Sequence, residues 1–299
     1  MKPVLHQKNK GWIRMITQRV YIRRAVSAII AFLLIVLLPL PAAKAEGEVL
    51  LHCFSLGKAD SFAIVTGEGT VLIDCGESGQ GDIILEWLKQ QGIDRIDTLI
   101  ITHFDKDHVG GAAKVLKKIP VSRVLQSNSP KDSKEYRKYL SALALAGLEA
   151  ETVREELSFT LGDAAFTVYP PERESYAKDP SNNSSLVTAM RHGECSFLFT
   201  GDAESARLQE LVEEKLGQFD FLQVPHHGVW QTQLISLLNM VQPEAAVITS
   251  SEKEPEDQAT VSLLEKYAGQ ILLTREGEVD ILSDGSSLSV CQEIFAAAA

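Results

Sequence analysis

The segment of residues 102–111, with the sequence THFDKDHVGG, constrains this chain most, because two imidazoles and two carboxylates lie within six of its residues. The apolar run at residues 99–101 precedes it and is typical of a buried strand. The polar side chains would therefore gather at one strand end. Imidazole and carboxylate together suit zinc, manganese or iron. A polar loop with histidines present by chance is the alternative, but similar strand ends elsewhere in the chain favour a metal site.

Three further segments place an acid or an imidazole directly after an apolar, strand-like run. They are Asp74 after residues 71–73, Asp202 after residues 197–201, and His226 with His227 after residues 221–225. In α/β sheets, functional sites lie outside the carboxyl ends of the strands. We therefore expect all four segments to converge on one site.

Apolar periodicity predicts an antiparallel start followed by alternating strands and helices. Residues 169–181 are rich in proline and polar side chains and are expected to form a surface loop. No linker divides residues 46–299, so we expect one α/β domain of two sheets with helices outside. The helices are expected at residues 83–91, 112–119, 131–146, 203–216, 231–241 and 261–267.

Residues 1–45 have the form of a signal peptide, with eight basic side chains, no acids and an apolar run from Ala25 to Leu38. The run is shorter than the ~20 residues that a spanning helix needs. We expect cleavage after Ala45 and a secreted domain of residues 46–299. The alternative is an uncleaved segment that anchors this domain to the outer face of the cytoplasmic membrane.

Charge limits the partners of the remaining domain. Removal of residues 1–45 takes away only basic charges and changes the formal net charge from −11 to −19. Such an acidic surface repels polyanions at long range, so tight nonspecific nucleic-acid binding is not expected. DNA remains open as a substrate.

With these four segments, the chain resembles the metallo-β-lactamase fold family, whose members have a four-layer αββα sandwich and are mostly binuclear metal hydrolases. The resemblance covers residues 49–290. Five segments, in order, also resemble the C-terminal domain of ComEC competence proteins: LGKADS at 56–61, THFDKDHVGG at 102–111, NNSSLV at 182–187, FTGD at 199–202 and VPHHG at 224–228.

The resemblance also implies a role for each residue of the site. It places His103 and Asp105 on a first metal, Asp107 and His108 on a second metal, and Asp202 between the two. The pair His226 and His227 closes the second site, with His227 favoured as the ligand and His226 as a phosphate contact or general acid. Asp107 also orients the metal-activated water.

Two departures from the family pattern affect the metals. Asp105 stands where many members have histidine, which makes the site richer in oxygen and favours manganese over zinc. The usual mid-chain histidine ligand is absent, and its place falls near residues 181–183, where Ser and Asn bind metals poorly. One or two divalent ions, zinc or manganese, are therefore expected, and the first would be weakly held or missing.

The leading functional hypothesis is an exported, metal-dependent hydrolase of phosphodiester bonds. Its substrate would be DNA, as the ComEC resemblance implies, or a small or cell-wall phosphate ester, which suits the acidic surface better. Two alternatives stay open. The same fold supports lactam or thioester hydrolysis, and a catalytically degenerate domain would act as a binding module.

Overall fold

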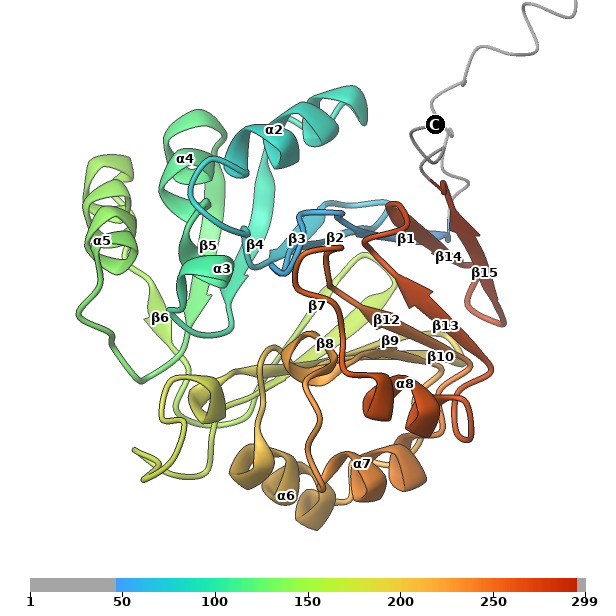
Figure 1. The fold of residues 1–299 in the computed structure, drawn as a ribbon. Helices are drawn as coiled ribbons and strands as arrows, with labels where there is room; N and C mark the ends of the chain where they lie inside the picture. Colours follow the sequence, from blue (N-terminus) through green and yellow to red (C-terminus); the bar gives the residue numbers. More distant parts are fainter. Residues whose placement is uncertain (1–46, 295–299) are drawn as a thin grey trace, which may run out of the picture. The chain divides into compact units, whose positions relative to one another are not determined.

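The computed structural model describes residues 47–294, and within them the strands form two sheets (Figure 1). The predicted signal segment of residues 1–45 lies outside the described residues. In spatial order, the first sheet contains β15 (Leu288–Gln292), β14 (Val279–Ser283), β1 (Val49–Cys53), β2 (Phe62–Val65), β3 (Thr70–Ile73), β4 (Ile96–Ile101), β5 (Val121–Gln126) and β6 (Glu151–Thr152). The second contains β13 (Gln270–Leu273), β12 (Ala245–Ile248), β11 (Phe221–Gln223), β10 (Cys195–Phe199), β9 (Val187–His192), β8 (Ala164–Tyr169) and β7 (Leu157–Leu161).

Helices cover the outer face of each sheet (Figure 1). The first sheet carries α2 (Gly81–Gln90), α4 (Ala112–Lys118) and α5 (Lys134–Ala146), and the second carries α6 (Ser205–Glu214), α7 (Leu234–Val241) and α8 (Gln258–Leu264). One apolar core lies between the first sheet and its helices, and another lies between the second sheet and its helices. A third apolar core, rich in phenylalanine, fills the space between the two sheets. The expected four-layer αββα sandwich is therefore confirmed. Among residues 47–294, no helix combines the length and apolar character needed to cross a membrane.

Parallel strand pairs bring the carboxyl ends of neighbouring strands to one edge of each sheet. Strands β3, β4 and β5 are parallel neighbours in the first sheet, and β10, β11, β12 and β13 are parallel neighbours in the second. Parallel strands need a crossover, usually a helix, and the outer helices supply it. The segments singled out in the sequence follow β3, β4, β10 and β11, so this topology positions the site.

The start of α5 differs from the sequence prediction in a way that matters for the site. The helix was expected over residues 131–146 but begins at Lys134. Ser133 has extended backbone, and its hydroxyl accepts a hydrogen bond from Tyr136 N at 3.1 Å. A serine in this position satisfies one free amide of the first helical turn, so it ends the loop and starts the helix. Lys131 therefore lies in the loop after β5.

Several strands were absent from the sequence prediction. Strand β5 was not predicted, and neither was the hairpin of β7 and β8. The sequence of β7, LSFTL, does alternate apolar and polar residues with a period of two. The remaining expected helices differ from the observed ones by at most three residues at either end.

A buried ion pair fixes the loop between β8 and β9 to α6. Arg207 is fully buried and donates to Glu210 Oε2 at 3.1 Å and to the carbonyl oxygen of Tyr169 at 3.0 Å. The hydroxyl of Tyr176, which belongs to the loop, donates to Glu210 at 2.8 Å. The amide of Arg207 donates to Asn183 Oδ1 at 2.9 Å. Both ends of this expected surface loop are thus tied to one helix.

We expect Arg207→Met to lower the free energy of unfolding by up to about 3–5 kcal/mol, because it leaves the buried carboxylate of Glu210 with only the exposed Arg173 as a cation, at 3.3 Å. The control is Arg137→Met, which removes an exposed arginine that pairs with Asp132. That change should cost less than about 1 kcal/mol. Urea denaturation of both variants measures the difference, and equal losses would contradict the assigned role.

Candidate metal centre

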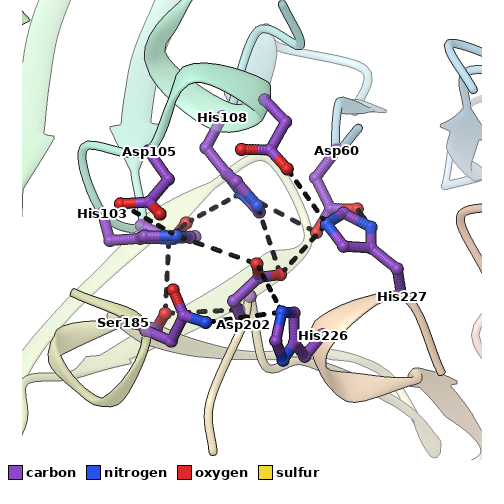
Figure 2. A network of polar contacts seen from close by, with 12 residues as sticks. Asp60, His103, Asp105, His108, Ser185, Asp202, His226 and His227 are labelled. Carbon is purple, nitrogen blue, oxygen red and sulfur yellow. Dashed lines mark hydrogen bonds and ion pairs between the residues drawn. The ribbon is translucent and has the colours of Figure 1, made fainter. Parts of the chain in front are cut away.

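The four segments predicted from the sequence meet at facing edges of the two sheets (Figure 2). Asp74 follows β3, and His103 and Asp105 follow β4. The short helix α3 (Lys106–Val109) carries Asp107 and His108, Asp202 follows β10, and the turn η2 (Pro225–Gly228) carries His226 and His227. The structure thus brings all the predicted site residues into one neighbourhood.

Asp202 lies at the middle of this neighbourhood (Figure 2) and is only 2% exposed. Its Oδ1 is 3.2 Å from Nε2 of His108 and 3.4 Å from Nε2 of His227. Its Oδ2 is 3.9 Å from Nε2 of His103 and 3.8 Å from Nε2 of His226. One carboxylate therefore faces imidazoles from both sheets.

Four of these residues form a compact group with the chemistry of a metal site. Among the described residues, Asp107, His108, Asp202 and His227 each offer one ligand atom, and these atoms lie within 4.8 Å of one another. Nε2 of both imidazoles and Oδ1 of Asp202 are buried and have no hydrogen-bond partner within residues 47–294. Buried polar atoms without partners are rare in folded proteins. Two imidazoles and two carboxylates suit a divalent cation, so these residues fit a metal ion.

The pKa shifts of His108, His227 and Asp202 indicate which protons a bound ion would displace. Burial alone would lower the pKa of His227, but Asp202 and Asp60 outweigh it and raise the pKa to about 10. The pKa of His108 lies well above its ordinary value against the same opposing burial, because of Asp202 and Asp74. The two imidazoles in turn hold the pKa of Asp202 well below its usual range despite burial. Protons on the imidazoles neutralise the carboxylates, and a bound cation would displace those protons.

Buried partners orient the two imidazoles so that Nε2 points inward. Nδ1 of His108 lies 2.7 Å from Asp74 Oδ2. Nδ1 of His227 lies 2.9 Å from Thr249 Oγ1, and this hydroxyl donates to Asp60 Oδ1 at 2.5 Å. Such outer partners fix the ring and its tautomer in metal sites.

The sequence left open which imidazole of the 226–227 pair is the ligand, and the two differ clearly in the structure. Both residues have left-handed backbone, with φ of 49° at His226 and 54° at His227, a conformation that non-glycine residues adopt rarely. This turn sends His227 into the group of four. Nδ1 of His226 instead lies 3.0 Å from Glu204 Oε1, and its ring is partly exposed. The geometry is compatible with His227 as ligand and His226 as a separate functional group.

His103 and Asp105 stand outside the compact group. Nε2 of His103 lies 4.0 Å from Asp105 Oδ1. That same oxygen accepts hydrogen bonds from Lys131 Nζ at 2.5 Å and from the hydroxyl of Ser181. Burial raises the pKa of Asp105, but His103, Lys131 and Ser181 together bring it below its ordinary value.

Sequence reasoning gave no role to several residues that contact the site, among them Lys131, Glu204 and Thr249. Thr249 follows β12, so the strand-end pattern could have identified it. Glu204 lies two residues after Asp202, but a single carboxylate carries little signal. Nothing in the sequence around Lys131 distinguishes it from its basic neighbours.

The fold and this geometry define the class of protein. Residues 55–250 match the Metallo-beta-lactamase superfamily, whose members are typically metal-dependent hydrolases, and the chain belongs to this superfamily. It is similar to ComE operon protein 3 of Bacillus subtilis, with 30% identity over 258 residues, which are 78% of this chain and 32% of that protein. It is also similar to Recombination protein 2 of Haemophilus influenzae, with 28% identity over 243 residues, 80% of this chain and 28% of that protein.

These matches confirm the resemblance to ComEC-like proteins, and the chain spans about a third of the length of either relative. Among solved structures, the metallo-beta-lactamase fold protein YhfI from Bacillus subtilis aligns with a TM-score of 0.54 and 9% identity. The alignment covers 76% of this chain and 95% of YhfI. At this identity, the likeness concerns the fold.

We expect Asp74→Asn to weaken metal binding about 10–100-fold, because the imidazole of His108 loses its carboxylate partner. A matched control exists in Asp280→Asn, since Asp280 Oδ1 also lies 2.7 Å from a histidine Nδ1, that of His52, away from the site. Competition with a chromogenic chelator measures the affinity of each variant. A comparable loss in both would mean that the effect does not pass through His108.

Proposed function

We propose that this chain is a metal-dependent hydrolase of phosphodiester bonds. The compact group of Asp107, His108, Asp202 and His227 carries the proposal, because Nε2 of both imidazoles and Oδ1 of Asp202 have no hydrogen-bond partner among the described residues. These four side chains would hold the ion. A bound divalent cation supplies positive charge that polarises a phosphoryl oxygen and lowers the pKa of water towards neutrality.

His226 would move the proton that the reaction requires. Its Nε2 faces the centre, 3.8 Å from Asp202 Oδ2, and its Nδ1 faces Glu204 Oε1 at 3.0 Å. Burial lowers the pKa of this imidazole, so its neutral form can accept at Nε2 the proton that the attacking water loses. Burial raises the pKa of Glu204 to about 7. In its ionised form Glu204 would stabilise the imidazolium, which would then give the proton to the leaving oxygen, as carboxylate-oriented histidines do elsewhere.

Two observations point to different phosphodiesters. The name of one relative, Recombination protein 2, refers to a process of DNA and supports a nuclease. The net charge of −19 that remains after residue 45 supports a small or cell-wall ester, because a polyanion would be repelled. We propose that the chain hydrolyses phosphodiester bonds in either case. A substrate screen would decide between DNA and a small or cell-wall ester.

The proposed activity would take place outside the cytoplasm. Its support is the signal-like sequence of residues 1–45, with its basic start, short apolar run and small residues at 43 and 45. If the segment is retained, it would hold the domain at the outer face of the membrane. Fractionation of cells that express the whole chain, with sequencing of the mature N-terminus, tests this part.

The activity is tested by hydrolysis of bis-p-nitrophenyl phosphate with zinc and manganese supplied separately. We expect Asp202→Ala to abolish turnover and to lower the bound metal, because this carboxylate belongs to the group of four. His192→Ala should change neither, since His192 contacts Ser283 away from the site. Equal loss in the two variants would contradict the assignment.

Turnover of a lactam or thioester instead of the phosphodiester would favour the alternative hydrolase, and absence of both metal and turnover would favour a binding module.

A separate prediction distinguishes the two adjacent imidazoles. His226→Ala should leave the bound metal unchanged and lower kcat by about 10²–10⁴-fold, the usual contribution of a positioned acid or base. His227→Ala should lower the bound metal. Metal analysis and steady-state kinetics on the same preparations check both, and the reverse pattern would exchange their roles.

A further inference from the structure

A pocket of about 500 Å³ lies beside Asp105, between the loop after β5 and the loop before η1 (Asn182–Ser184). Its lining includes Lys131 from the first loop and Ser181 from the second. The ammonium of Lys131 and the hydroxyl of Ser181 both donate hydrogen bonds to Asp105 Oδ1. The pocket therefore adjoins the half of the centre that contains His103 and Asp105.

The hydrogen bonds on Asp105 leave little room for a cation. An ionised carboxylate oxygen has about two lone-pair sites. Oδ1 already accepts from the ammonium of Lys131 and the hydroxyl of Ser181, and Oδ1 is the oxygen that faces His103 Nε2. The lone pairs that would bind an ion between His103 and Asp105 are thus engaged.

The engagement of Asp105 Oδ1 leaves this half of the centre with fewer free ligand atoms. Oδ2 of Asp202 faces Nε2 of His103 at 3.9 Å and Nε2 of His226 at 3.8 Å, and the proposed function assigns His226 to proton transfer. Catalytic metal sites usually have three protein ligands. The side chain that stands in the region of the family's mid-chain histidine is Ser181, and its hydroxyl is turned onto Asp105. The ammonium of Lys131 would also repel a divalent ion that shared its carboxylate.

Nε2 of His103 is also buried without a hydrogen-bond partner among the described residues, but the other half offers more such atoms. Nε2 of His108, Nε2 of His227 and Oδ1 of Asp202 have no hydrogen-bond partner among the described residues. Asp107 completes this group. Among residues 47–294, no lysine or arginine forms an ion pair with any of these four side chains. Lys131, by contrast, forms an ion pair with Asp105. The centre is therefore asymmetric.

We propose that the chain binds a single divalent ion, in the group of Asp107, His108, Asp202 and His227, and that the ammonium of Lys131 takes the place of a second ion on Asp105. The proposal concerns the same centre as the proposed function and rests on its metal site, but it does not depend on the substrate. Lys131 is a positioning residue here, because it acts through Asp105.

The test is the number of ions bound per chain after equilibration with manganese or zinc and removal of the excess. The wild-type chain should bind one ion. Lys131→Met removes the competing charge and frees Oδ1 of Asp105, so this variant should bind two. The double variant Lys131→Met, His103→Ala should return to one, because the added ion loses its imidazole.

Two control variants separate charge from other effects. Lys131→Arg keeps the cation on Asp105 and should bind one ion. Lys138→Met removes an exposed lysine of α5 and should also bind one. Circular dichroism of each variant establishes that it is folded.

Two ions in the wild-type chain, or one ion in folded Lys131→Met, would overturn the proposal. A wild-type chain that binds no ion would overturn the proposed metal centre as well. A chain that binds one ion but hydrolyses no phosphodiester would overturn the proposed function alone, so the two failures are distinguishable.

Discussion

The buried carboxylate of Asp202 is the constraint on which the rest of the site depends. It faces imidazoles from the first sheet, His103 and His108, and imidazoles from the second sheet, His226 and His227, at 3.2–3.9 Å. Such a group cannot form within one element or one sheet. The carboxyl ends of β3 and β4 must meet those of β10 and β11, which requires the parallel crossovers and the apolar core between the sheets.

Polar contacts between the sheets and local backbone strain hold this arrangement. Gln223 Nε2, from the second sheet, donates to Asp60 Oδ2, and the amide of Asp60 donates to the carbonyl oxygen of Asp107. Asp74, His226 and His227 all have positive φ. Residues in this conformation cost about 1–3 kcal/mol each and persist only where the surrounding structure fixes them. Their concentration at one site shows that the local backbone is arranged around the inward side chains.

The sequence predicted the parts of the site that follow from strand ends. Asp74, His103, His108 and Asp202 each come directly after or close to an apolar run, and parallel pairing within each sheet, with the packing of the two sheets on each other, brings them together. The resemblance favoured His227 over His226 as the ligand, but the residue types themselves do not encode the left-handed turn that separates the two imidazoles. Lys131 was placed in a helix, because helical periodicity extends through residue 131 and the serine cap at Ser133 went unrecognised. That one cap decides whether the lysine can reach Asp105.

The charges next to the ligand atoms favour the asymmetric arrangement. The carboxylates of Asp107 and Asp202, with two neutral imidazoles, carry two negative charges, which one divalent ion neutralises. Asp105 carries a third, which Lys131 neutralises. Asp60 and Asp74 add negative charge behind the two imidazoles, so the competition between Lys131 and a second ion is local to Asp105 and does not follow from the total charge. The position of one lysine therefore decides how many ions this version of the fold can hold.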